Sequence, residues 1–175
     1  MNDEDAVWLQ SLPKEKLVNL LSLQISNIWR VDGLYFLGIE ESFGTDAATN
    51  IDRNCWSSLA KMEARDLSEL LELKSRDLES FIKALRATSW ALYQEAKEWQ
   101  VSSDQAVFRV TSCRTQKARA RKGLSEFPCK KVRWAYLKEF AKAFNPEIEV
   151  NCIVCPPDKH SEKIWCEWEF VLKPK

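Results

Sequence analysis

The spacing of apolar residues changes near Glu95, and that change constrains the fold more than any other feature. Up to about residue 94 apolar residues recur every three to four positions, and from Glu95 they begin to alternate. Helical spacing followed by alternation predicts helices first and strands later. At 175 residues the chain suits a single domain. We therefore expect one α+β domain over residues 1–175, with a helical part (1–94) packed on a small antiparallel sheet in an α+β part (95–175).

Three helices are expected in the first part. Ser11 and Pro13 begin the first, which Gly44 ends. The second starts at Thr45 or Asp46 and reaches about Leu73, and the third opens at Ser75-Arg-Asp77 and runs through Trp90. The residues expected to face inward on the second helix are Ala47, Ile51, Cys55, Leu59 and Met62.

The second part is expected to contain two pairs of strands and two helices. Residues 98–101 and 106–111 alternate around Ser102-Ser-Asp104 and predict a hairpin. A short basic helix over 113–122 ends at Gly123, and a longer helix spans about 129–144. Residues 147–152 and 164–172 are the second pair of strands.

Five of the six cysteines lie after residue 112, and their environment decides how they are interpreted. The acidic N-terminus does not resemble a secretory signal, and no stretch of eighteen apolar residues suggests a membrane span. These features predict a cytoplasmic protein that does not enter membranes. In a reducing compartment, clustered cysteines indicate metal binding or chemistry rather than disulfides.

A metal site is expected at Cys129, Cys152, Cys155 and Cys166. Cys152-Ile-Val-Cys155 forms a C-x2-C turn at a strand end, a geometry that suits tetrahedral zinc. Cys166 lies on the returning strand, and Cys129 begins a helix whose N-terminus favours the thiolate. Zinc is the first choice of metal and an iron–sulfur cluster is the alternative. His160, the single histidine, is an alternate ligand.

The C-terminal third resembles a known family. Cys129, the helix after it, Glu149-Val-Asn-Cys152 and Cys166-Glu-Trp-Glu-Phe170 are similar to the 4-vinyl-reductase-like small-molecule-binding domain. That resemblance implies zinc bound by Cys129, Glu149, Cys152 and Cys166. This sequence adds Cys155, and a thiolate binds zinc better than a carboxylate does, so Cys155 is preferred over Glu149.

Two further resemblances imply no metal ligands. The segment from Cys113 to the final hairpin also resembles the L-2-amino-thiazoline-4-carboxylic acid hydrolase-like family. The full length is most similar to an uncharacterised group of prokaryotic cytosolic proteins, through Trp29-Arg-Val-Asp-Gly-Leu-Tyr-Phe36, Cys113-Arg-Thr-Gln116 and Cys155-Pro-Pro-Asp158. That group implies no activity.

A ligand site is expected along the first helix. Trp29, Phe36 and Glu40 share one helical stripe and Asp32 lies beside it, which fits a small-molecule pocket with aromatic walls and a polar end. The alternative is that both acids are solvated at the helix edge or paired with Arg65 or Arg114. In the basic segment we expect Cys113 and Arg114 to reach the ligand.

These features favour a domain that is stabilised by a bound zinc ion and that binds a small molecule of unknown identity. The alternative is a hydrolase of a small cyclic or amide substrate, with Cys113 or a metal-bound water as nucleophile. No nucleic-acid partner is expected, because the basic helix lacks interleaved aromatic residues. Eight tryptophans are compatible with exposed apolar patches and hence a homodimer.

Overall fold

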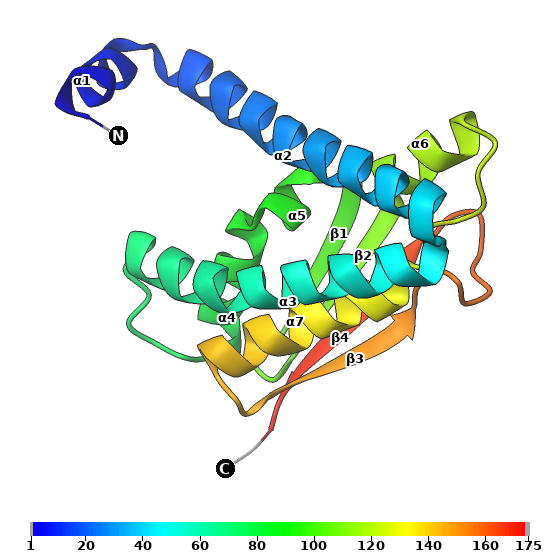
Figure 1. Cartoon of the computed structure of the whole chain (residues 1–175). Coiled ribbons are helices and arrows are strands. Elements are labelled where there is room, and N and C mark those ends of the chain that lie inside the picture. The colour runs from blue at the N-terminus through cyan, green and yellow to red at the C-terminus, as the bar shows by residue number, and fades with distance from the viewer. Residues whose placement is uncertain (1, 174–175) are drawn as a thin grey trace.

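The computed structural model describes residues 2–173, and its helices precede and then interrupt a single sheet (Figure 1). The helices are α1 (Asp3–Ser11), α2 (Lys14–Phe43), α3 (Thr45–Leu70), α4 (Leu78–Ala87), α5 (Ser89–Tyr93), α6 (Arg114–Arg121) and α7 (Cys129–Phe144). The strands are β1 (Ala96–Val101), β2 (Gln105–Ser112), β3 (Ile148–Val154) and β4 (Cys166–Leu172). The α+β class predicted from the change of spacing is confirmed.

Local signals account for most helix boundaries. Gly44 has φ 85°, a conformation that glycine adopts readily, and it separates α2 from α3. Asp77 begins α4 by accepting a hydrogen bond from the Ser80 backbone N–H at 2.8 Å. The expected single helix through Trp90 is wrong, because Thr88 is extended and accepts a hydrogen bond from the Ala91 N–H, which starts α5.

The four strands form one antiparallel sheet in the order β1-β2-β4-β3. Both predicted hairpins are present, and the central pair β2 and β4 joins them. On β2, buried Ala106, Phe108 and Val110 alternate with less buried residues, so one face of the sheet carries the core. The other face carries polar pairs such as Arg109 with Glu167, whose Nε and Oε2 atoms are 2.6 Å apart.

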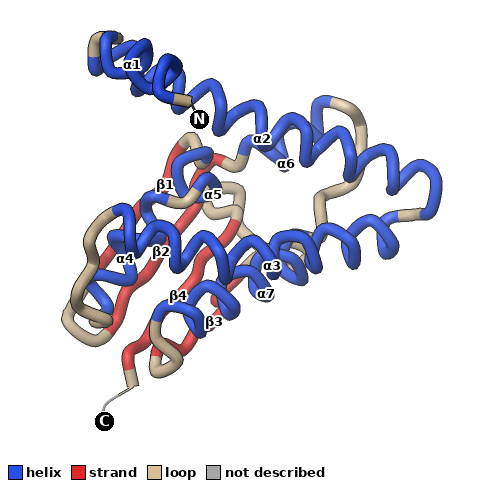
Figure 2. Tube along the Cα trace, turned by 60° about the vertical axis from the view of Figure 1, so that its left-hand side comes forward, coloured by secondary structure: helices blue, strands red, loops and turns tan. Residues whose placement is uncertain are grey.

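Helices cover the buried face in successive layers (Figure 2). α4 and α7 pack on the sheet, α3 packs along α7, and α2 packs on α3 and α5. α1 and the N-terminal half of α2 project beyond the other elements in both views (Figures 1 and 2).

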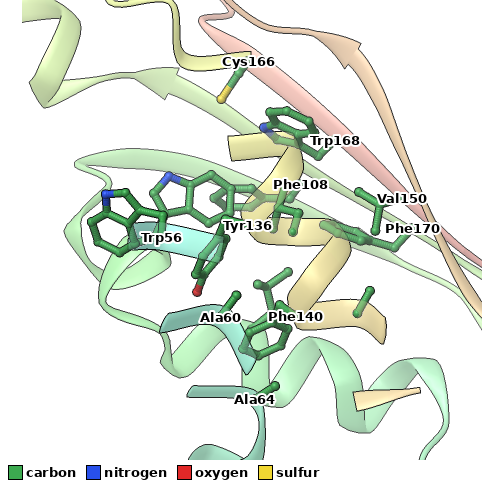
Figure 3. Close-up of a cluster of buried hydrophobic side chains, with 14 of the residues drawn as sticks. Trp56, Ala60, Ala64, Phe108, Tyr136, Phe140, Val150, Cys166, Trp168 and Phe170 are labelled. Carbon is green, nitrogen blue, oxygen red and sulfur yellow. The ribbon is translucent and has the colours of Figure 1, made fainter. Parts of the chain in front are cut away.

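The buried face of α3 differs from the expected one. Ala60 and Ala64 are buried against Tyr136 and Phe140 of α7 (Figure 3), together with Ala48 and Trp56. Of the residues expected to face inward, Ile51, Cys55 and Met62 are exposed, while Ala47 and Leu59 are half-buried. The expectation failed because small alanines let two helix backbones approach closely, so the contact face is the small one rather than the more apolar one.

A single hydrophobic cluster contains residues of both parts of the chain, from Ile25 on α2 to Phe170 on β4. Its largest fully buried side chain is Trp168 on β4. No helix within residues 2–173 combines the length and apolarity that a membrane crossing requires.

Candidate ligand cavity and thiol cluster

A cavity of about 390 Å³ lies between α2, α3, α5, α6 and α7. Its volume falls in the range of small-molecule pockets. Among its lining residues are Trp29, Asp32, Phe36 and Cys113, four of the six residues expected from sequence to contact a ligand. The spacing of α2 brings the first three to one side of that helix, and Cys113 enters from the N-terminus of α6.

Stacked aromatic rings form one wall of the cavity. Trp29 lies between Trp56 and Tyr93, with ring centroids 4.7 and 5.0 Å away and interplanar angles of 18° and 8°. The Trp29 Nε1–H donates to the Ser89 carbonyl at 3.2 Å, which fixes the indole. The stacked rings cover one another's faces and give this side of the cavity an apolar surface.

Arg133 of α7 lies on the cavity lining with its charge almost completely buried. The residue is 3% exposed, and its guanidinium carbon lies 4.7 to 5.5 Å from the ring centroids of Trp29, Trp56, Trp90 and Tyr136. Within residues 2–173 its Nε and Nη1 atoms have no hydrogen-bond partner. The rings stabilise the cation, but two N–H donors still lack acceptors.

Two carboxyl groups, Asp32 and Asp52, lie on the same lining. Asp32 accepts a hydrogen bond from Trp56 Nε1 at 3.1 Å. Burial raises the pKa of Asp32, and burial together with the charge of Asp32 raises the pKa of Asp52 to about 7. The charge of Arg133 acts on both carboxyl groups and lowers their pKa values, but by less than burial raises them.

Arg133 and Asp52 were not among the residues expected from the sequence to line a ligand site. Arg133 was one of many cations between residues 109 and 133, and Asp52 was one acid on a helix whose buried face was assigned incorrectly. Their shared signal is a charged residue at helical spacing from buried ones, such as Arg133 beside Tyr136 and Leu137. That signal is weak, because amphipathic helices often carry charges at the edge of the buried face.

The other two expected ligand residues lie elsewhere. Glu40 accepts bidentate hydrogen bonds from Arg119 at 2.8 and 3.0 Å, so neither expected partner, Arg65 nor Arg114, is bound to it. Arg114 is exposed and its guanidinium lies 5.2 Å from the Tyr93 ring centroid, so its expected inward orientation is wrong. Arg119, one turn and a half later on α6, is the arginine that turns inward.

Cysteines from three segments approach one another beside the cavity. Hydrogen bonds with the thiols of Cys129 and Cys166 raise the pKa of Cys155. The same contact with Cys155 lowers the pKa of Cys129, which accepts that bond. Burial raises the pKa of Cys152 to about 11, with smaller influences from Lys130, Asp158, Cys166 and Cys129, so this thiol lies in the same neighbourhood.

Backbone contacts hold these segments together. The Lys130 N–H at the start of α7 donates to the Pro156 carbonyl at 2.8 Å, and Lys130 Nζ lies 2.8 Å from Asp158 Oδ2. The Trp165 N–H donates to the Val110 carbonyl at 2.9 Å, which aligns the start of β4 with β2. Thus the helix start, the turn after β3 and the start of β4 converge.

The expected metal ligands are only partly brought together. Across residues 2–173, no three His, Cys, Asp or Glu side chains form a group arranged to hold a metal ion. Glu149 is exposed and its Oε2 lies 3.2 Å from Lys173 Nζ; strand alternation turns it away from Cys152. His160 packs on Trp165 and its Nε2 lies 3.3 Å from Glu126 Oε1.

The surroundings of Cys113 do not activate it. Burial, with smaller influences from Cys129 and Cys166, raises the pKa of its thiol to about 12, whereas nucleophilic cysteines have lowered pKa values. His160 makes its hydrogen-bond contacts with Ser161 and Glu126. Neither contact involves Cys113, so His160 is not placed to act as its base.

Comparison with known proteins agrees with the full-length resemblance. No curated protein is similar enough to be matched with the chain. A family model described as "Family of unknown function (DUF6125)" matches residues 10–172, which includes nearly every helix and strand and all of the residues that line the cavity. The chain belongs to this family of unknown function, DUF6125.

Proposed function

We propose that the protein is a small-molecule-binding domain whose cavity takes a planar ligand with an anionic group. The observation that carries this proposal is Arg133, a nearly fully buried cation on the cavity lining with two unpartnered N–H groups. Burying a charge without hydrogen-bond partners costs several kcal/mol, on the order of 2–5. A carboxylate or sulfonate in the cavity can accept hydrogen bonds from those two N–H groups and so remove this cost.

The rest of the lining defines the ligand further. The Trp29, Trp56 and Tyr93 stack provides apolar area against which a ring system can pack. Asp52 can donate or accept a hydrogen bond near neutral pH, because burial and the charge of Asp32 raise its pKa to about 7. A ring that carries an acid for Arg133 and a polar atom for Asp52 matches all three features.

Two fluorescent probes test the charge requirement directly. Anilinonaphthalene sulfonate has an apolar ring system and one anionic group, while phenylnaphthylamine has similar rings without the sulfonate. In the proposal, the wild-type protein binds the sulfonate more tightly than the neutral probe. Arg133→Met should weaken the affinity for the sulfonate probe at least about tenfold and change the affinity for the neutral probe by less than about twofold.

The matched control is Arg114→Met, since Arg114 also lies over an aromatic ring of the cavity but is exposed. It removes the same charge, and binding of both probes should stay near the wild-type value. Circular dichroism checks that each variant is folded. If Arg114→Met weakens the sulfonate and Arg133→Met does not, the assignment of the anion to Arg133 is wrong. An equal loss of affinity for both probes in Arg133→Met would also contradict that assignment.

We further propose that zinc binds the thiol cluster and stabilises the fold. The proposed ligands are Cys129, Cys152, Cys155 and Cys166. Glu149 and His160 are the alternates, and an iron–sulfur cluster is the alternative to zinc. Support comes from the contact of Cys155 with two other thiols and from the similarity to the 4-vinyl-reductase-like pattern. Thiolates suit zinc, and four of them leave no open position for catalysis.

Elemental analysis of the purified protein tests the metal separately from the ligand. One equivalent of zinc is expected, with loss of metal and of thermal stability in Cys155→Ser. Cys55→Ser is the control, because Cys55 is exposed on α3. Iron with strong visible absorption would identify the iron–sulfur alternative. A metal-free wild-type protein that unfolds at the same temperature with and without chelator would overturn this proposal.

A further inference from the structure

The outward face of α2 is apolar although α2 is bound to the protein through another face. Its buried residues are Ile25, Trp29 and Phe36. Leu21, Ile28, Val31 and Tyr35 are 55%, 50%, 52% and 72% exposed. Isolated short helices are marginally stable in water, so the projecting half of α2 needs a packing partner (Figures 1 and 2).

Leu21, Ile28, Val31 and Tyr35 follow a coiled-coil pattern, whereas the exposed Val18, Leu23, Leu34 and Phe43 lie outside it. One line along the helix, which we name the α2 seam, advances by alternating steps of four and three residues. Its members are Leu17, Leu21, Gln24, Ile28, Val31, Tyr35, Gly38 and Ser42. None of them is charged. The cavity-lining Trp29, Gly33 and Phe36 lie on a different side of α2, so the seam is separate from the ligand site.

We propose that the α2 seam pairs antiparallel with the same seam of a second copy of this chain. In antiparallel pairs, the two seam positions of each heptad alternate across the interface. Placing Ile28 opposite Val31 of the second copy makes a two-fold arrangement with both aliphatic layers at its centre. The projecting half of each α2 then lies along the supported half of the other.

The seam is self-complementary in size and polarity in this register. Tyr35 lies opposite Gln24, whose amide can bond the phenol, and Leu21 lies opposite Gly38, which leaves room for it. In this register the first turn of one α2, with Lys14, Glu15 and Lys16, lies at the same end as Glu41 of the other, so its two lysines are near an opposite charge. A two-fold interface requires such a surface, since both copies present the same residues.

The size of the interface predicts a reversible dimer. A helix of 30 residues is about 45 Å long, and a strip about 10 Å wide along it covers about 450 Å² per copy. The total of about 900 Å² lies at the low end for specific association. α1, which precedes the projecting end of α2, carries two further exposed apolar residues, Val7 and Trp8. Dimerisation should therefore depend on concentration in the micromolar range.

Sedimentation velocity between about 1 and 300 µM measures this equilibrium. Ile28→Lys should raise the dimer dissociation constant at least about 100-fold, because each substitution acts twice in a two-fold interface. Leu23→Lys is the matched control: Leu23 is 48% exposed on the same helix but outside the seam. Its dimer should be unchanged. A wild-type protein that stays monomeric throughout, or equal loss of dimer in both variants, would overturn the proposal.

Cross-linking tests the orientation. In a Cys55→Ser background, Leu21→Cys mixed with Gly38→Cys should form a disulfide-linked dimer under mild oxidation. Nothing lies within 4 Å of a Cβ added at Gly38, so this substitution fits the single chain. Leu21→Cys alone should form no link beyond that of the background, because antiparallel pairing separates the two copies of position 21 by about 25 Å. Linking of Leu21→Cys with itself would instead identify a parallel pair.

Discussion

Replacing Asp52 with asparagine should make the protein more stable at neutral and alkaline pH. Burial and the charge of Asp32 raise the pKa of Asp52 from 3.8 to about 7. The folded state therefore keeps a proton that the unfolded chain releases. The stability that protonated Asp52 contributes is fully present below about pH 4 and is lost as the pH rises through about 7. Because each pKa unit corresponds to about 1.4 kcal/mol, the full loss is at most about 4 kcal/mol.

Asparagine keeps the shape of the side chain and a donor for Asp32 without any charge. Urea unfolding of the wild type and Asp52→Asn between about pH 4.5 and 8.5 measures the difference. The variant should be more stable by about 2–4 kcal/mol near pH 8, and the difference should shrink toward zero near pH 4.5.

The control is Asp46→Asn, which removes the same charge from an exposed position on the same helix. This variant is not expected to gain stability near pH 8 as Asp52→Asn does. A difference between the wild type and Asp52→Asn that is constant from about pH 5 to 8 would refute the claim that the folded protein holds Asp52 in its protonated form.

Three further substitutions test the packing around the cavity by urea unfolding. Ala60→Leu should destabilise the protein by about 1–3 kcal/mol, because Ala60 is fully buried between α3 and α7; no loss would contradict that close approach. Arg119→Met should cost about 1–3 kcal/mol by leaving the Glu40 carboxylate unpaired, and adding Glu40→Gln should recover part of this loss; a purely additive pair would show that the two do not interact. Tyr136→Phe should cost about 1–2 kcal/mol, because the buried phenol donates to Glu63 Oε2 at 2.6 Å; an unchanged midpoint would count against that bond.

Element boundaries were the most predictable part of this protein, because the signals for them are local. The Cys129–Phe144 helix, the Gly44 break and both hairpins follow from spacing, glycine and proline over a few residues. Thr88 shows the limit of such reasoning, since one threonine interrupts an otherwise continuous apolar pattern. The side of a helix that packs was harder to predict, as α3 shows, because it depends on the fit to α7 rather than on hydrophobicity alone.

The sequence by itself determined most of the order of helices and strands, but not α1 or the break between α4 and α5. It also determined the apolar stripe of α2 that carries Trp29 and Phe36, and the segments that contain the cysteines. Only the tertiary structure decided which charges share the cavity: Arg133, Asp52 and Asp32 come from three different helices. It also decided that Arg119, rather than Arg114, pairs with Glu40. The physical reason is that helical spacing is a property of neighbouring residues, whereas the burial and pairing of a charge depend on what distant segments place beside it.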